Sequence, residues 1–237
     1  DIAVANSESH SVGVLLNKGA GEFPIGVPPT VSVGAFPYPL AAGDFNHDGY
    51  DDLVVGAPGA DLGLGSEDIG GLYVYHGGAA GLSPSYDLTQ GDGGGSHEAG
   101  DRFGAALCTG DFNGDGTADI GVGSPGEDAG AGTAFYFCGG TFGLVTGPQG
   151  WFKQSSLGGV NTATDGFGTS VAAGNVAGSA HDDLIIGTPY KDPGGVTNAG
   201  LVYVVLGSSS GPNAATRRTY DAATGDLGGR QAGGLFG

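Results

Sequence analysis

Short apolar runs alternate with glycine-rich turns along most of the chain. Three of the clearest runs read GLYVYHGG from Gly71, TAFYFCGG from Thr133 and GLVYVVLG from Gly200. They are rich in β-branched and aromatic residues and end at glycines, as β-strands do. Two further runs, LVVGAP and IGVGSP, are too short for helices and end at Pro58 and Pro125. The pattern predicts an all-β protein of many short antiparallel strands with tight turns.

The apolar runs recur together with two short markers. A Phe-Gly pair precedes the inner strand of a unit, at Phe103-Gly104, Phe167-Gly168 and Phe236-Gly237. A Gly-x-Pro triplet follows the second strand, at Gly56-Ala57-Pro58, Gly123-Ser124-Pro125 and Gly187-Thr188-Pro189. Each unit therefore has three clear strands and a weaker fourth. Radial repetition of four-stranded sheets makes a β-propeller.

We therefore expect a β-propeller of four-stranded antiparallel blades, with about four repeats in a single region over residues 1–237. The expected repeats are 1–33, 34–102, 103–166 and 167–235, with the start of a further repeat at 236–237.

Two acidic loops, DFNHDGYDD and DFNGDGTAD, lie between the first and second strands of two repeats. Calcium takes about 6 to 8 oxygen ligands at roughly 2.3–2.6 Å, so a short loop must turn several oxygens toward one point. The loops predict two Ca²⁺ sites, with Phe45 and Phe112 packed under them. In the first loop the expected ligands are Asp44, Asn46, Asp48, the backbone carbonyl of Tyr50, and Asp52. In the second they are Asp111, Asn113, Asp115, the backbone carbonyl of Thr117, and Asp119.

Two other loop types share part of this pattern. An EF-hand requires a glutamate at position 12 and flanking helices, whereas Val55 and Val122 stand there between strands. The second alternative, which the sequence does not exclude, is a turn rich in Asp and Asn that binds no ion. Two loops with the same five ligand positions favour metal. A third loop, from Asn175 to Asp183, has Ala177 in place of Asn and is expected to be empty or very weak.

Composition and charge exclude several classes of partner. The net charge is −18 with only 7 Lys and Arg, which argues against nucleic acid and anionic membranes. There is no apolar run long enough for a transmembrane helix, so membrane insertion is not expected. Calcium is plentiful outside the cell, which favours a secreted or cell-surface location. The sequence indicates no oligomeric state.

No catalytic motif is visible, so the sequence predicts no catalytic residues and no enzyme activity. The five histidines are scattered, without HExxH spacing, and no GxSxG nucleophile elbow or phosphate-binding GxxxxGK loop is evident. Glu127 and Asp128 follow the second Gly-x-Pro triplet; a solvated acidic turn and a ligand-facing surface are both possible there. Cys108 and Cys138 lie on strands separated by a third strand, which favours two buried, unpaired thiols over a disulfide.

Phe-Gly, the DxNxDGxxD loop and Gly-Ala-Pro, in that order, resemble the FG-GAP repeat of the integrin α-subunit β-propeller. The first repeat resembles shorter relatives in bacterial secreted and surface proteins. The resemblance covers essentially the whole chain and implies a propeller of usually seven blades, of which this chain would be a part. It also implies calcium loops on a lower face, recognition loops on an upper face, and extracellular binding or adhesion.

The sequence is compatible with two functions. The first is a non-enzymatic recognition or adhesion module that binds a protein or glycan ligand through its loop face. The second is a non-catalytic or substrate-holding part of a larger secreted enzyme, or a structural subunit of a surface assembly.

Overall fold

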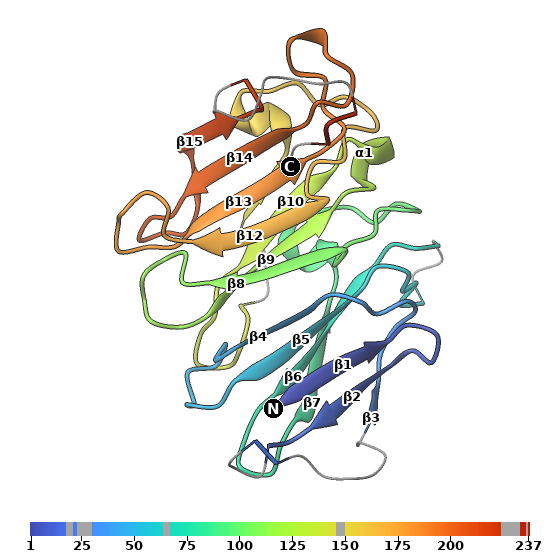
Figure 1. The fold of residues 1–237 in the computed structure, drawn as a ribbon. Coiled ribbons are helices and arrows are strands. Elements are labelled where there is room, and N and C mark those ends of the chain that lie inside the picture. Colours follow the sequence, from blue (N-terminus) through green and yellow to red (C-terminus); the bar gives the residue numbers. More distant parts are fainter. Residues whose placement is uncertain (18–20, 23–29, 64–66, 146–149, 224–232, 236) are drawn as a thin grey trace.

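The computed structural model describes the chain except at residues 18–20, 23–29, 64–66, 146–149, 224–232 and 236. The described strands form four antiparallel sheets, stacked in a curved row along the chain (Figure 1). Besides the strands there are short helical turns: η1 (Gln90–Gly93), α1 (Glu127–Gly130), η2 (Gln154–Leu157) and η3 (Pro193–Gly195). None of the described helices has the length and apolar character needed to cross a bilayer.

Within each sheet, consecutive strands along the chain are neighbours. The first sheet has three described strands, β1 (Ile2–Asn6), β2 (Ser11–Leu15) and β3 (Thr30–Ser32). The second contains β4 (Leu40–Gly43), β5 (Asp52–Ala57), β6 (Gly71–His76) and β7 (Ser83–Leu88). The third contains β8 (Ala106–Gly110), β9 (Asp119–Ser124), β10 (Thr133–Phe137) and β11 (Gly150–Phe152). The fourth contains β12 (Ser170–Gly174), β13 (Asp183–Thr188), β14 (Leu201–Leu206) and β15 (Asn213–Tyr220).

The sheets are the blades of a partial β-propeller, which confirms the expected fold class. Second and third strands such as β5, β9 and β10 are buried, or nearly so, along their whole length. The outer strands β7 and β15 are mostly exposed and carry more polar residues. A strand with one solvated side has a weaker apolar pattern, which explains why the fourth strand of each repeat was the least clear in the sequence.

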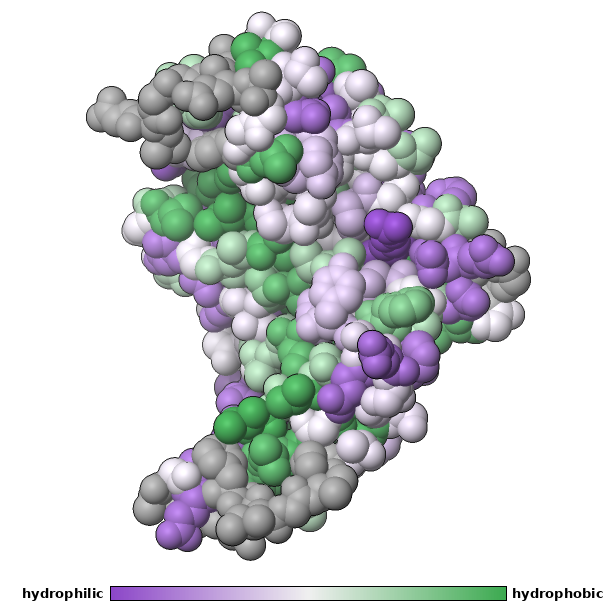
Figure 2. Space-filling view, turned by 45° about the vertical axis from the view of Figure 1, so that its right-hand side comes forward, coloured by the Kyte–Doolittle hydropathy of each residue, from purple (hydrophilic) through white to green (hydrophobic). Residues whose placement is uncertain are grey.

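The hydrophobic core is divided into clusters between consecutive sheets. One cluster joins the second and third sheets through Leu72, Val74, Phe103, Ile120 and Phe135, among others. Another joins the third and fourth sheets through Phe112, Tyr136, Phe167, Ile186 and Tyr203. Each large side chain buried in this way stabilises the fold by about 1.5–3 kcal/mol. Figure 2 shows hydrophobic residues gathered along the concave side of the molecule.

The repeated glycines lie where two neighbouring sheets touch. A Cβ on Gly123 would lie 2.0 Å from the carbonyl oxygen of Gly168, and one on Gly56 would lie 2.2 Å from that of Gly104. In both pairs the glycine of a Gly-x-Pro triplet meets the Phe-Gly glycine of the following repeat. The two motifs are therefore the two halves of one joint between blades, closed by backbone against backbone.

The cysteines remain free thiols. β9 lies between β8 and β10, as the sequence spacing indicated, so Cys108 and Cys138 are on strands that are not neighbours. Both are partly buried, where two buried thiols were expected. Burial raises the pKa of each thiol to about 12, so neither is a ready nucleophile at neutral pH.

Candidate functional site

The first acidic loop, between β4 and β5, is folded around its own carboxylates. The Asp44 carboxylate accepts the backbone N–H of Asp48 at 3.0 Å and of Gly49 at 2.9 Å. Asn46 Oδ1 also accepts the N–H of Asp48, and Asp48 Oδ1 accepts that of Tyr50 at 2.9 Å. Gly49 has a φ of 88°, which glycine adopts without the Cβ penalty of other residues. The side-chain oxygens are thus held on the inner side of a tight turn.

The second loop, between β8 and β9, repeats this pattern bond for bond. Its hydrogen bonds join Asp111 to Asp115 and Gly116, Asn113 to Asp115, and Asp115 to Thr117. Burial alone would raise the pKa of Asp115, but hydrogen bonds from Thr117 and Asn113 outweigh it and hold the pKa below its usual value. The carboxylate is therefore ionised at neutral pH, as a metal ligand must be.

The last aspartate of each loop is buried and bonded to two separate segments. Phe112 N–H donates to Asp119 Oδ2 at 2.8 Å, and Gly139 N–H donates to Oδ1 at 2.9 Å. Burial raises the pKa of Asp119 to about 6 and also raises the pKa of Asp52. Asp52 and Asp183 accept equivalent pairs of N–H groups in their own sheets. This residue ties its loop to the segment that follows the third strand.

The ten predicted ligands therefore lie in two matching loops, but their carboxylates are not tightly gathered. In neither loop, both fully described, do the three carboxylates lie within 4.8 Å of one another. The predicted ligands are all hard oxygens, which calcium prefers, and the side-chain oxygens lie on the inner side of each turn. In the third loop Asn175 Oδ1 accepts the N–H groups of Gly178 and Ser179, with Asp183 as the remaining carboxylate of the predicted pattern. Calcium binding in the first two loops, and its weakness in the third, stay predictions.

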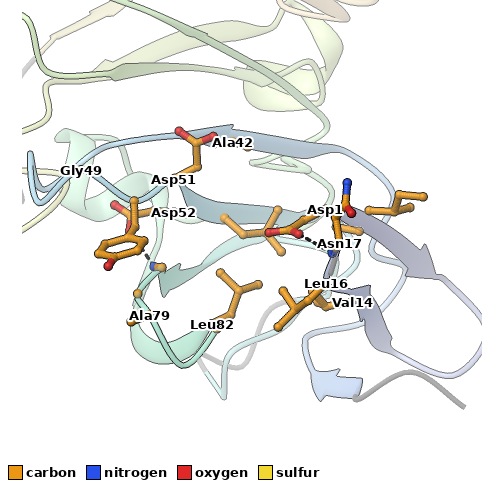
Figure 3. Close-up of a pocket in the computed structure, with 17 residues that line it drawn as sticks. Asp1, Val14, Leu16, Asn17, Ala42, Gly49, Asp51, Asp52, Ala79 and Leu82 are labelled. Atoms are coloured by element: carbon orange, nitrogen blue, oxygen red, sulfur yellow. Dashed lines mark hydrogen bonds between the residues drawn. The ribbon is translucent and has the colours of Figure 1, made fainter. Parts of the chain in front are cut away.

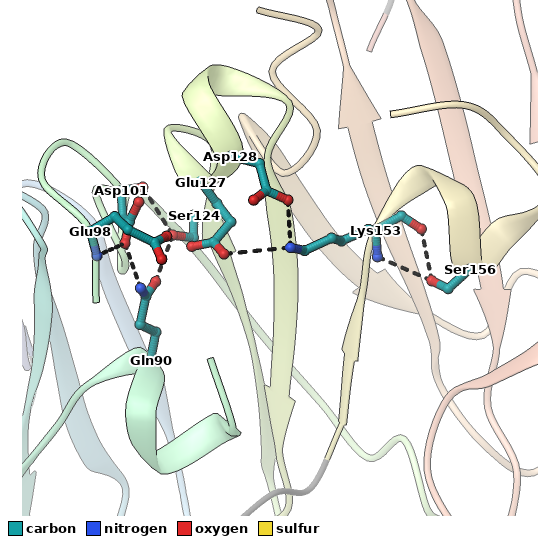
Figure 4. A network of polar contacts seen from close by, with 8 residues as sticks. All are labelled: Gln90, Glu98, Asp101, Ser124, Glu127, Asp128, Lys153 and Ser156. Carbon is teal, nitrogen blue, oxygen red and sulfur yellow. Dashed lines mark hydrogen bonds and ion pairs between the residues drawn. The ribbon is translucent and has the colours of Figure 1, made fainter. Parts of the chain in front are cut away.

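A group of three acids that the sequence analysis did not assign lies at the other end of the third sheet. Oxygens of Glu98, Asp101 and Glu127, hereafter the carboxylate cluster, all lie within 4.8 Å of one another (Figure 4). Glu127 is only 4% exposed, so for this residue the solvated acidic turn is wrong, whereas Asp128 is exposed. Burial, with Asp101 nearby, raises the pKa of Glu127 to about 7. Comparing Glu127 with the equivalent position of the next repeat, Lys191, could have drawn attention to it.

Exposed aromatic side chains gather at the end of the blades opposite the acidic loops. Phe36 and Tyr38 precede β4, and Tyr190 follows β13; all three are exposed. Tyr38 and Arg102 line two adjoining cavities of about 290 and 380 Å³, with Phe36 in the first and Tyr190 in the second. Aromatic rings beside a single guanidinium, in shallow hollows, are typical of recognition surfaces.

A larger cavity of about 570 Å³ lies between the first and second sheets, at the acidic-loop end (Figure 3). Aliphatic side chains such as Leu16 and Leu82 face it, together with Asp1 and Asp52. Asp1 Oδ1 accepts the backbone N–H of Asn17 at 2.7 Å. None of the described lining residues is Lys or Arg.

Comparison with known proteins agrees with this architecture. The FG-GAP repeat model matches residues 36–75 and 103–137, and the FG-GAP-like repeat model matches residues 1–55. Phosphatidylinositol-glycan-specific phospholipase D of Bos taurus is 33% identical over 74% of this chain and 22% of its own length. Integrin alpha-PS2 of Drosophila melanogaster is 35% identical over 66% of this chain and 12% of its own. Integrin alpha-V of Gallus gallus is 29% identical over 78% of this chain and 16% of its own. The chain thus spans about a fifth or less of these relatives.

Proposed function

We propose, from the premise that this chain is a partial β-propeller of FG-GAP repeats, that it is a calcium-stabilised extracellular module for recognition or adhesion. It binds a protein or glycan ligand and performs no catalysis itself. In this proposal the two acidic loops hold Ca²⁺ at one end of the blades, and the ligand binds at the opposite end.

Calcium would act on the joints between sheets, because the acidic loops are bonded to the following blade. Ala118 N–H donates to Asp44 O at 3.1 Å, and Asp182 N–H donates to Asp111 O at 2.8 Å. An ion held by side chains of the loop would fix the carbonyls that receive these bonds. The blades would then keep one relative position, and the loops at the far end would be pre-organised for binding.

The observation that carries the recognition proposal is the exposed surface formed by Phe36, Tyr38, Arg102 and Tyr190. Exposed aromatic residues and arginine are the types that contribute most to binding energy at protein interfaces. They come from two inter-sheet connections and a hairpin, so they lie together only when the blades are stacked. The surface also includes Arg102, one of only seven Lys and Arg residues in the chain, with Asp68 in the same cavity.

The test is binding of the purified chain to arrays of immobilised extracellular-matrix proteins and of glycans, in calcium. For any ligand found, the double variant Tyr38→Ala, Arg102→Ala should lose affinity by roughly 30-fold or more, since truncating a hot spot costs about 2 kcal/mol. The control is Phe142→Ala, which removes an aromatic ring that is 90% exposed in the β10–β11 connection. Equal binding by all variants, or no ligand on either array, would contradict the proposal.

The alternative is that the chain is a non-catalytic or substrate-holding part of a larger secreted enzyme. It is favoured by the similarity to phosphatidylinositol-glycan-specific phospholipase D, of which the chain matches about a fifth. Asp101 and Glu127 have raised pKa values, as a catalytic pair would, but neither lines the two cavities beside Tyr38. The sequence that flanks this segment in its full protein would decide between the two: a catalytic domain there favours the alternative.

A further inference from the structure

The repeats differ in charge at one equivalent site, a small group of side chains next to the start of each inner strand. Aligning Phe103 with Phe167, and Pro125 with Pro189, matches Asp101 to Asp165 and Glu127 to Lys191. The same alignment matches Glu98 to Thr162, and in the second repeat it places Gly34 and Ala60 at the two buried positions. One repeat therefore has no charge there, one has a carboxylate with an ammonium, and one has three carboxylates.

In the fourth sheet this site is occupied by the side-chain ammonium of Lys191. Lys191 Nζ donates to Asp165 Oδ2 at 2.7 Å, to Val160 O at 2.7 Å and to Thr162 Oγ1 at 3.2 Å. Gln154 Nε2 donates to the same oxygen of Asp165 at 2.9 Å. The buried aspartate is thus compensated by an ammonium that three oxygens surround.

In the third sheet the same framework surrounds a different set of side chains. Gln90 Nε2 donates to Asp101 Oδ2 at 2.5 Å, as Gln154 does to Asp165, and Glu98 N–H donates to the same oxygen at 2.6 Å. Asp101 is 1% exposed and Glu127 4% exposed. Three carboxylates within 4.8 Å, two of them buried, are costly unless a cation compensates them.

The nearby lysine compensates only one of the three acids, because Lys153 pairs with Glu127 and with neither Glu98 nor Asp101. Lys153 Nζ lies 2.5 Å from Asp128 Oδ2 and 3.5 Å from Glu127 Oε1, on the side away from Asp101. Glu127 Oε2 is buried and has no hydrogen-bond partner among the described residues. Figure 4 shows this oxygen pointing toward Glu98 and Asp101. A buried, unpartnered carboxylate oxygen aimed at two further carboxylates indicates a ligand position.

We propose that the carboxylate cluster binds a divalent cation, Ca²⁺, in the place that the Lys191 ammonium holds in the next repeat. All the side-chain donors of the cluster are hard oxygens, which favours Ca²⁺ over Zn²⁺. Glu98 and Asp101 lie in the connection that leaves the second sheet, and Glu127 lies in a hairpin of the third. The ion would therefore fasten two consecutive blades at the end opposite the acidic loops.

The test counts calcium bound per chain by equilibrium dialysis, with the acidic loops disabled by Asp48→Ala and Asp115→Ala. This double variant should retain one bound calcium, and adding Glu98→Gln with Glu127→Gln should remove it. Adding Glu8→Gln instead, at an exposed acid of the first sheet, should leave the bound calcium in place. No calcium on the loop double variant, or retention after both Gln changes, would overturn the proposal.

A second variant keeps the test informative if the Gln changes prevent folding. Glu98→Thr with Glu127→Lys copies the side chains of the fourth sheet, so the protein should fold, lose one calcium, and no longer need that ion. Unchanged calcium stoichiometry in this variant would also overturn the proposal. If the acidic loops bind nothing, the wild type itself binds one calcium, so failure of the loop sites is distinguishable from failure of the cluster.

Discussion

At the scale of single residues, the last aspartate of each acidic loop has a structural role that is separate from its predicted metal role. Asp183 shows this most clearly, because it makes the same two backbone contacts, and a third from Ala177 N–H, in a loop where Ala177 and Ser179 replace two of the four side-chain ligands. Val176 N–H and Gly207 N–H each donate to it at 3.0 Å, and its side chain is fully buried. Its position is therefore explained without calcium.

We predict that Asp183→Asn destabilises the protein by about 1–3 kcal/mol, equally with calcium and with chelator. An amide nitrogen cannot accept a hydrogen bond, so one buried N–H loses its partner. Urea unfolding in each condition measures the loss, and Asp51→Asn, the same change at an exposed aspartate, is the control. A loss seen only in calcium would mean that Asp183 is a ligand and that the prediction is wrong.

Some residues could be placed from the sequence and others could not. Phe45 and Phe112 were expected under their loops, and both are fully buried. The other side chains of the turn are polar, so the aromatic ring leaves water only by packing beneath the loop. The burial of Glu127 could not be predicted. Its neighbours along the chain are a glycine and an acid, as in a solvated turn. Its partner Asp101 lies in another connection. Contacts between connections carry no local pattern.

At the scale of elements, the strands depend on glycines where the sheets meet. We predict that Gly123→Ala destabilises the protein by about 1–3 kcal/mol or more, because its Cβ would lie 2.0 Å from Gly168 O and backbone must shift. The control is Gly78→Ala, whose Cβ would meet its nearest atom at 3.9 Å. Thermal unfolding of both variants measures the difference. Equal stability would show that the backbones at this joint can move apart without destabilising the protein, and would contradict the prediction.

The strands themselves were largely predictable. The three aromatic or aliphatic runs became β6, β10 and β14 within a residue of their expected starts, because their residues fit a buried pleated sheet. The register between sheets was not predictable, since it is set by the close approach of glycines that carry no side-chain pattern of their own.

At the scale of the whole molecule, calcium is expected to hold the blades in one arrangement. We predict that the melting temperature rises with Ca²⁺ and falls on chelation, by about 5–10 °C per site at a hundred-fold excess over Kd. The double variant Asp48→Ala, Asp115→Ala should lose the share of the shift that the two acidic loops contribute. Ser179→Ala, the equivalent position of the third loop, is the control and should change nothing in the calcium response. An unchanged melting temperature on chelation would contradict the loop sites.

The architecture as a whole followed from repetition in the sequence, because each repeat must bury its faces against the next. The recognition surface did not follow from it. Phe36 and Arg102 stand at opposite ends of the repeat over residues 34–102, and Tyr190 belongs to the repeat over 167–235, so they share a surface only after the blades have stacked.

The glycine joint has a consequence for how such a chain can lengthen. Its two halves come from successive repeats and meet through backbone alone, so neither half depends on the loops that its own repeat carries. Duplicating one repeat would place a Phe-Gly glycine against a Gly-x-Pro glycine again. The loops can diverge, with a lysine in one copy and a glutamate in another, while this glycine contact between copies stays the same.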